Sequence, residues 1–337
     1  MSTAHVGGPG GATLPPIDPL GPSGPGAWYV DDLVRVRAVG TLRQWSRDSV
    51  RTEHFDVRHV GTRVHVEHWV PPSRVDDDLA GLLADELFSP GWLRGTELFE
   101  RVFTGVVRTA AVDPLEAWLL FYRNSLRRIS RELAPSGSAA PAESGGSPGH
   151  GTISSYAPVY QHAEQLVSGG SVLELGSCFG FLSLRLAGGG RSVTASDVSA
   201  GTMRLLATTA PLLGVRLETR VADAARFPAP DCSVDTVLAS HLLEHLDPAH
   251  GDRVVAEAVR LARDRVVLAV PLEQLADATW GHVRTVSLDD LHVWGESTGL
   301  PYDVHEHHGG WLVIETRRDR RSSRPRSATP LESGGAA

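Results

Sequence analysis

The chain has 337 residues, of which 41% are hydrophobic and 21% charged, so it is long enough for one large or two modest globular domains. Its formal charge is −8 and its isoelectric point is near 6.0. This balance disfavours nucleic acid as a partner, because phosphate contacts need clustered cations. All 32 basic residues are arginine, and the absence of lysine excludes a Walker A lysine, a Schiff-base lysine and a catalytic lysine.

The two cysteines, Cys178 and Cys232, provide neither a disulfide framework nor a zinc cluster, and both are expected to be small core residues. No charged-then-apolar leader opens the sequence. No apolar run approaches the roughly 18 residues that a membrane span needs. We therefore expect a cytoplasmic protein with no membrane partner. The sequence leaves the oligomeric state open.

Three low-complexity segments divide the chain. Residues 1–27 hold seven glycines and six prolines, a composition that predicts disorder. Residues 135–151 are similarly rich in proline, glycine and serine and predict a flexible linker. Residues 317–337 carry a cluster of arginines that is typical of a solvated, disordered basic tail. Two folded regions remain, 28–134 and 152–316.

The first folded region predicts a small α+β module. Hydrophobic residues alternate with polar ones on both sides of Gly61-Thr62, so Phe55 to Trp69 is expected to form a β-hairpin. From Leu79 onward the apolar spacing becomes helical, and Pro114 suits the first turn of a helix. We expect this module to pack near the open edge of a ligand site in the second region. The alternative is that its apolar residues only form its own core.

The second folded region alternates strands and helices, which predicts an α/β fold with a doubly wound, mostly parallel sheet. In that architecture, ligands bind outside the carboxyl ends of the strands. The expected strands are 171–176, 192–197, 216–221, 233–240 and 265–270, with helices ending near 187 and spanning about 200–210 and 249–262.

A glycine-containing turn follows the first of these strands. Glu174, Gly176 and Gly180 have the spacing acid-x-Gly-x-x-x-Gly, and such a turn brings backbone N–H groups close to a ligand at the start of a helix. A dinucleotide site would need G-x-G-x-x-G, but Cys178 stands at the second glycine position and no glycine occupies the third. The turn therefore disfavours a dehydrogenase, a competing hypothesis on the same fold.

The spacing resembles motif I of the class I S-adenosylmethionine (SAM)-dependent methyltransferases, a family with a Rossmann-like fold. The resemblance continues in order over about 160 residues, through LLEHLDP after the fourth strand and GHVRTVSLDDL beyond the fifth. It implies that SAM is the cofactor. The cofactor-binding residues that it implies are Glu174, Gly176, Ser177, Cys178, Gly180, Asp197, Val198, Asp223, Ala224 and Ser240.

Two acids in this set have specific expected roles. Asp197 ends the second strand, 21 residues after Gly176, where a carboxylate can accept hydrogen bonds from both ribose hydroxyls. Its alternative role is to cap the helix that begins near Ser199. Asp223 matches the acid that accepts from the adenine amine, with an exposed loop aspartate as the alternative.

Three histidines are candidates for the base that deprotonates an alcohol acceptor: His241, His245 and His282. His241 lies nearest the end of its strand. With Glu244 and His245 it also fits H-x-x-E-H, the pattern of an inverted zincin, but a position directly after a sheet strand suits a methyltransferase better. A divalent cation on this segment is the remaining alternative. We expect no metal requirement, because these ligands all lie on one short segment.

The acceptor is expected to be a sugar or small-molecule hydroxyl. The sequence has neither [ND]-P-P-[YFW] nor Pro-Cys, which disfavours methylation of nucleic acid. The segments SSYAPVY and LELGSCFGFLSLRLA, together with the N-terminal module, resemble the mycofactocin oligosaccharide methyltransferases. That resemblance implies a glucose hydroxyl as the acceptor. A quinone or phenol methyltransferase and a non-catalytic SAM-binding module remain alternatives.

Overall fold

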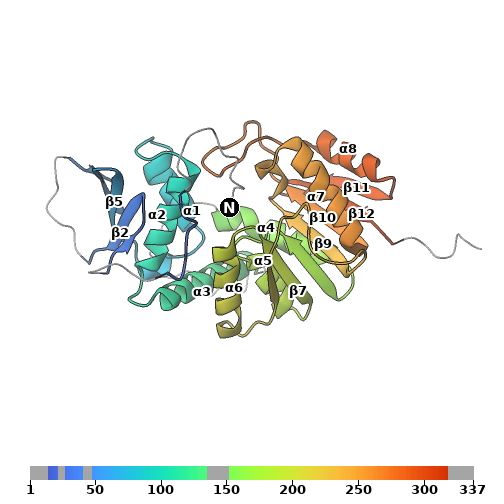
Figure 1. The fold of residues 1–337 in the computed structure, drawn as a ribbon, viewed down its shortest axis with the longest axis horizontal. Helices are drawn as coiled ribbons and strands as arrows, with labels where there is room; N and C mark the ends of the chain where they lie inside the picture. Colours follow the sequence, from blue (N-terminus) through green and yellow to red (C-terminus); the bar gives the residue numbers. More distant parts are fainter. Residues whose placement is uncertain (1–13, 22–26, 41–47, 135–151, 318–337) are drawn as a thin grey trace, which may run out of the picture.

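A computed structural model describes residues 14–21, 27–40, 48–134 and 152–317. Two parts of the molecule lie side by side: an N-terminal module, blue to cyan in Figure 1, and a larger α/β domain, green to red. Most of residues 1–27, the 135–151 linker and the basic tail beyond Arg317 lie outside the described residues, so the predictions made for them stay predictions. Within the described part, no helix combines the length and apolarity that crossing a bilayer takes.

The N-terminal module contains a five-stranded sheet in the order β1-β2-β5-β4-β3. The predicted hairpin is confirmed, because β4 and β5 pair antiparallel across the Gly61 turn. The strands are β1 (Tyr29–Val30), β2 (Val34–Ala38), β3 (Val50–Arg51), β4 (Phe55–Val60) and β5 (Arg63–His68).

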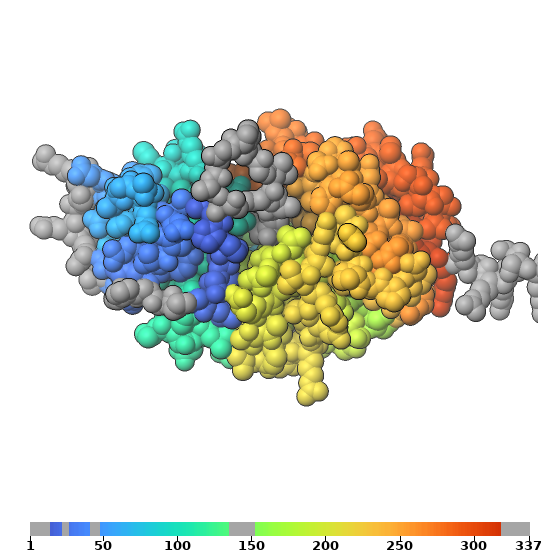
Figure 2. All heavy atoms as spheres, viewed as in Figure 1, coloured from blue at the N-terminus to red at the C-terminus, as the bar shows by residue number. Residues whose placement is uncertain are grey.

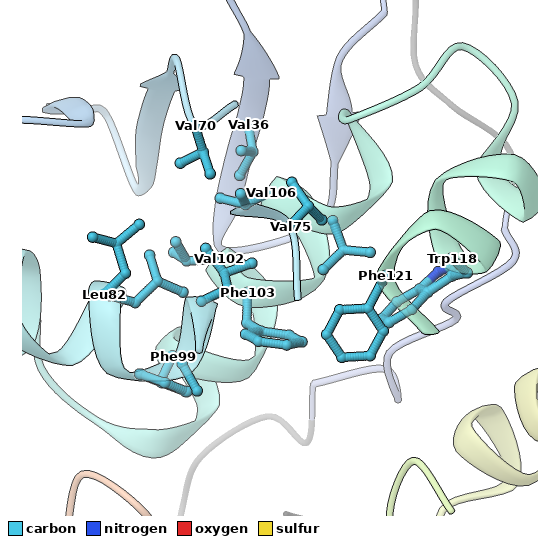
Figure 3. Close-up of a cluster of buried hydrophobic side chains, with 14 of the residues drawn as sticks. Val36, Val70, Val75, Leu82, Phe99, Val102, Phe103, Val106, Trp118 and Phe121 are labelled. Carbon is cyan, nitrogen blue, oxygen red and sulfur yellow. The ribbon is translucent and has the colours of Figure 1, made fainter. Parts of the chain in front are cut away.

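Helices cover one face of this sheet. Pro114 occupies the first turn of α3, as expected, and the Asp113 side chain caps that helix by accepting from the Glu116 N–H at 2.9 Å. Val36 and Val106 join Phe103 and Phe121 in a buried cluster between the sheet and the helices (Figure 3). The helical elements are η1 (Pro72–Arg74), α1 (Leu79–Leu83), η2 (Ala84–Phe88), α2 (Thr96–Arg108) and α3 (Pro114–Glu132).

The α/β domain is built on a seven-stranded sheet in the order β11-β12-β10-β9-β6-β7-β8. The five strands from β10 to β8 are parallel, and β12 and β11 complete the edge as antiparallel strands. The strands are β6 (Ser171–Leu175), β7 (Ser192–Asp197), β8 (Glu218–Val221), β9 (Val234–Ser240), β10 (Ala262–Val270), β11 (Tyr302–Glu306) and β12 (Gly310–Glu315).

Helices cover both faces of this sheet (Figure 1). Alternate residues of β10 enter different hydrophobic clusters, Val266 and Leu268 facing one side and Val267 and Ala269 the other, as a strand buried on both faces requires. The helices are α4 (Thr152–Leu166), α5 (Phe181–Gly188), α6 (Ala200–Leu212), η3 (Leu243–His245), α7 (Pro248–Leu261) and α8 (Leu288–Thr298). The predicted doubly wound, mostly parallel sheet is therefore confirmed.

The strand order places a switch point between β6 and β9. From β6 the chain proceeds outward to β7 and β8, then returns to β9 on the other side of β6. The connections that leave the carboxyl ends of β6 and β9 consequently diverge and open a crevice between them. The predicted boundaries of the elements hold to within a few residues; for example, β8 begins at Glu218 rather than at residue 216.

Residues 14–21 differ from the disorder expected for the N-terminal segment, because they pack against the helices of the module. The Trp118 indole donates to the Pro19 carbonyl at 2.8 Å, and the Arg101 guanidinium donates to the Pro15 carbonyl at 2.7 Å. Arg101 is only 2% exposed, so its donors need acceptors inside the protein. In a proline-rich segment, backbone carbonyls are available to accept hydrogen bonds. The side chains that donate to them lie 86 or more positions further along the chain.

Candidate functional site

A cavity of about 1320 Å³ lies at the carboxyl ends of the parallel strands and extends to the N-terminal module. All of the site residues predicted from the sequence line it: Glu174, Gly176, Ser177, Cys178, Gly180, Asp197, Val198, Asp223, Ala224, Ser240, His241, His245 and His282. The fold therefore brings the two predicted groups, for cofactor and for catalysis, into one space.

The turn after β6 forms the cavity floor. Gly176, Cys178 and Gly180 all adopt positive φ angles, of 69°, 48° and 74°. A Cβ on Gly176 would come within 2.8 Å of the Leu242 side chain, and a Cβ on Gly180 would collide with Leu206. Both positions thus require glycine for conformation and for space. Cys178 keeps the left-handed conformation despite its side chain.

Asp197 fastens this turn to the neighbouring strand. One carboxylate oxygen accepts from the Cys178 backbone N–H at 3.0 Å and the other from the Ser199 N–H at 2.9 Å. The side chain that caps α6 is that of Ser199, which accepts from the Thr202 N–H. Asp197 is therefore not the helix cap. It is 5% exposed, and each of its oxygens retains a lone pair for a ligand.

Asp223 and Glu174 have contrasting surroundings. Asp223 lies in the loop after β8, where its side chain is half exposed and contacts the His250 Nε2 at 3.0 Å. Glu174 is a buried residue of β6, and the Ser183 hydroxyl donates to its carboxylate. Burial raises the pKa of the Glu174 carboxyl to about 7.

The segment after β9 holds the catalytic candidates. His241 follows the strand with a φ of 53°, and Leu243–His245 form only a short 3-10 helix. An inverted zincin needs both histidines on one α-helix, so that alternative does not fit. Burial lowers the pKa of His241 to about 4 and that of His245 to about 3, so both imidazoles are neutral at pH 7. Burial also raises the pKa of the Glu244 carboxyl to about 8.

The loop between β10 and α8 carries His282 to the same end of the cavity. The Val283 backbone N–H donates to the Glu244 carbonyl at 2.9 Å, and the His245 and His282 rings lie 4.9 Å apart at 80°. The His282 Nδ1 bonds to the Glu273 carboxylate at 2.7 Å. The three predicted histidines therefore converge, and Glu273 joins them.

Several wall residues were not predicted from the sequence. Asp77 and Glu100 come from the N-terminal module, Tyr156 from α4 and Trp280 from the loop before His282. Burial raises the pKa of the Asp77 and Glu100 carboxyls to about 7 each. Trp280 stands edge-on to Phe99 of α2 at 5.4 Å. Of these residues, only Asp77 belongs to a recognisable sequence pattern, the run of acids Asp76-Asp77-Asp78. Such runs usually indicate solvent exposure and not a ligand site.

The N-terminal module also directly supports the turn after β6. Phe179, within the turn, lies 5.7 Å from Phe103 and 5.3 Å from Phe121 between ring centroids. The buried Tyr122 hydroxyl donates to the Phe179 carbonyl at 2.9 Å. The module therefore packs beside the α/β domain, as expected (Figure 2, blue to cyan beside green to yellow). Its residues contribute walls to the cavity.

Comparisons with known proteins agree with this geometry. Residues 172–265, which span β6 to the middle of β10, match the model of a methyltransferase domain family. No curated protein matches the chain in sequence.

Among solved structures, the chain is similar to a SAM-dependent methyltransferase from Methanosarcina mazei, with 18% identity, 47% of this chain and 98% of that chain covered, and a TM-score of 0.41. It is also similar to the magnesium protoporphyrin IX methyltransferase from Synechocystis PCC 6803, solved with S-adenosylhomocysteine, with 18% identity, 47% and 77% coverage and a TM-score of 0.38.

The domain match, the switch-point cavity and the glycine turn together define a class I methyltransferase with a Rossmann-like fold. The chain is a SAM-dependent methyltransferase, and SAM is its cofactor.

Proposed function

We propose that this methyltransferase transfers the methyl group of SAM to a hydroxyl of a neutral, polyhydroxylated acceptor, a sugar. At its most specific, the proposal follows the resemblance to the mycofactocin oligosaccharide methyltransferases, and the acceptor is then a glucose hydroxyl of that oligosaccharide. The observation that carries the proposal is the charge of the cavity wall.

The described wall residues include many carboxylic acids and no arginine, and the sequence has no lysine. An acceptor with a phosphate or a carboxylate would find no arginine or lysine side chain in this wall to pair with, which is unfavourable. The acidic wall residues are Asp77, Asp85, Glu97, Glu100, Glu174, Asp197, Asp223, Glu273 and Glu306.

Unsatisfied acceptor atoms support a hydroxyl-rich ligand. The Glu100 Oε1, the Ser240 Oγ and the His241 Nε2 are buried and have no hydrogen-bond partner among the described residues. Hydroxyl groups of a sugar can donate to such atoms and remove the cost of leaving them unpaired. Trp280 and Phe99 offer apolar ring surface beside them, against which the C–H face of a sugar ring can pack.

In this proposal the cofactor occupies the end of the cavity at β6 and β7. The turn Gly176–Gly180 presents backbone N–H groups to the methionine part, with Glu174 beneath it. Asp197, with Val198 beside it, accepts from the ribose hydroxyls. Asp223, Ala224 and Ser240 surround the adenine end and the approach to the sulfonium. Each of these residues lines the cavity, and Asp197 retains accepting capacity.

The reaction needs little from the protein beyond position and one proton acceptor. The hydroxyl oxygen forms a bond to the methyl carbon while the carbon–sulfur bond breaks, and its electron pair stays on sulfur. The hydroxyl proton leaves to a nitrogen of the group His241, His245 and His282. His241, neutral and with an unpartnered Nε2, is the proposed acceptor.

Two other functions remain open to test. A phenol or quinone fits the aromatic wall, but it has too few hydroxyl groups to donate to all of the unpartnered buried atoms. A non-catalytic module that engages a partner protein would bind SAM without turnover. The histidines gathered beside the cofactor end favour catalysis over that alternative.

Mass spectrometry of metabolites from a deletion strain tests the proposal in the cell. We expect a sugar-containing metabolite to lose the mass of one CH₂ group. The wild-type gene should restore it and the His282→Ala variant should not, while His292→Ala, which removes an exposed histidine of α8, should behave as wild type. A methylated species that lacks any sugar would contradict the proposed acceptor class.

A further inference from the structure

Three side chains at the acceptor end of the cavity form a group with the composition of a metal site. One potential ligand atom each from Glu244, His245 and His282 lies within 4.8 Å of the other two. We propose that these three residues hold a divalent transition-metal ion, which binds an acceptor hydroxyl. This inference rests on the proposed function for the identity of the acceptor, but the ion site itself can be tested without any acceptor.

Glu244 gives the first independent reason. Its side chain is 1% exposed, and neither carboxylate oxygen has a hydrogen-bond partner among the described residues. The His241 Nδ1 lies 3.8 Å from the Glu244 Oε1, which is too far for a hydrogen bond. Ionising a buried carboxyl that has no hydrogen-bond donor is costly unless something positive binds the carboxylate. A cation between Glu244 and the two histidines supplies that partner.

The two imidazoles give the second reason. The His245 Nδ1 lies 3.1 Å from the Gly281 carbonyl, which can only accept, so this nitrogen carries the proton. The His282 Nδ1 likewise faces the Glu273 carboxylate at 2.7 Å. Each ring therefore has its Nε2 lone pair free. Metal-binding histidines are commonly oriented by a carbonyl or a carboxylate on the other ring nitrogen in this way.

In a second group of potential ligands among the described residues, the ring nitrogens already have hydrogen-bond partners. Glu53, His54 and Glu86 also bring their ligand atoms together. In that group the His54 ring binds Glu86 through Nδ1 at 2.6 Å, and its backbone N–H also donates to Glu86. Arg74 contacts the His54 Nε2 at 2.9 Å, so neither ring nitrogen is free for a cation. Of the two such groups among the described residues, the one at Glu244 has carboxylate oxygens with no hydrogen-bond partner.

Two nitrogen ligands and one carboxylate suit zinc, manganese, iron or cobalt more than calcium or magnesium. Three protein ligands leave coordination positions for other groups, and His245 and His282 line the cavity, so those positions face the acceptor. An oxygen bound there is polarised and releases its proton more easily. The site departs from our expectation of no metal, because the structure adds His282, which is remote in sequence, to the segment that follows β9.

Cobalt binding to the full-length, metal-free protein tests the site. Titration with Co²⁺, followed by its visible absorption, should show a single ion per chain. Glu244→Gln and His282→Asn should each weaken binding by at least roughly 100-fold, because each removes a direct ligand. Glu273→Gln should weaken it by about 10–100-fold by releasing the His282 ring. His292→Ala and Glu86→Gln, the controls, should bind as wild type.

Retained SAM binding shows in each variant that the fold persists. If the wild type binds no cobalt, or if Glu244→Gln and His282→Asn both bind it as tightly as the wild type, the metal site is wrong. Those results would leave the proposed acceptor untouched. Conversely, a cobalt site with no transfer of methyl to any sugar would contradict the proposed acceptor and leave the ion site in place.

Discussion

Cys178 stands where the methyltransferase motif usually has glycine, and its φ of 48° shows why glycine is usual there. A left-handed conformation costs an ordinary residue roughly 1–2 kcal/mol. Cys178 tolerates it because its side chain is small and its backbone N–H is held by Asp197. The turn therefore accommodates cysteine in a left-handed conformation at this position.

Substitutions at Cys178 should show whether SAM affinity depends on the backbone conformation of this residue or on its side chain. Cys178→Gly should keep SAM affinity within about twofold, because glycine accepts a positive φ without strain. Cys178→Val should lower affinity by at least about tenfold, because a β-branched residue is an outlier there. Calorimetric titration with SAM measures both. Equal affinity of the two variants would mean that the turn does not contact the cofactor.

Asp197 holds the turn after β6 through the Cys178 backbone N–H, and we propose that it also binds the ribose, so a substitution would remove both interactions. Asp197→Ala should weaken SAM binding by roughly 1–3 kcal/mol, the cost of losing charge-assisted hydrogen bonds to the ribose and to the turn. Asp223→Ala should cost less, because the Asp223 side chain is half exposed. Calorimetry on both variants makes the comparison. Wild-type affinity in Asp197→Ala would remove the ribose assignment.

Helix α3 of the N-terminal module contacts the turn after β6 through one hydrogen bond and several aromatic side chains. The Tyr122 hydroxyl donates to the Phe179 carbonyl inside a buried aromatic cluster. Burial raises the pKa of the Tyr122 hydroxyl far above its usual value, so the group donates at any working pH. The module thus supports the turn after β6 and also contributes walls to the cavity.

Tyr122→Phe should report this coupling. The Phe179 carbonyl would remain buried without its donor, which should destabilise the turn by about 1–3 kcal/mol. We expect SAM affinity and melting temperature to fall together. Tyr302→Phe, on the far edge strand β11, is the matched control and should change neither. A melting temperature that falls while SAM affinity stays constant would place the effect in the module alone.

The sequence predicted most elements because local patterns determine them. The strand-helix alternation of 171–270 and the Pro114 helix start are local signals, and both are confirmed. His282 lies beside Glu244 because the Val283 backbone N–H donates to the Glu244 carbonyl, 39 residues earlier in the chain. No periodic sequence pattern signals such a long-range contact. The order of residues 14–21 depends likewise on donors from distant helices.

At the scale of the whole molecule, the two folded parts share one hydrophobic core. A single buried cluster contains Trp118 and Phe121 of the module together with Phe181, Met203 and Leu206 of the α/β domain. From the sequence we predicted two separate folded regions, because a low-complexity segment divides them. The side-chain contacts show that they are not independent in the folded state.

Residues 152–316 expressed alone should therefore not form a stable enzyme. Removing the module exposes the apolar surface of α5 and α6 and removes the Tyr122 support of the turn. We expect a fragment that aggregates or melts well below the full chain, measured by circular dichroism, and that binds SAM poorly. A fragment that folds and methylates the same acceptor at the full-length rate would show that the module is dispensable.

Methyl transfer from SAM to a hydroxyl of a neutral sugar can be measured with a series of acceptors that differ in charge. The full-length protein is incubated with methyl-labelled SAM and a glucose oligosaccharide, its phosphorylated counterpart, an amino sugar or a phenol. We expect label in an O-methyl group of the neutral oligosaccharide and little or none in the phosphorylated one, because the described cavity walls contain acids and no arginine. Preferential labelling of the phosphorylated sugar or of the phenol would contradict it.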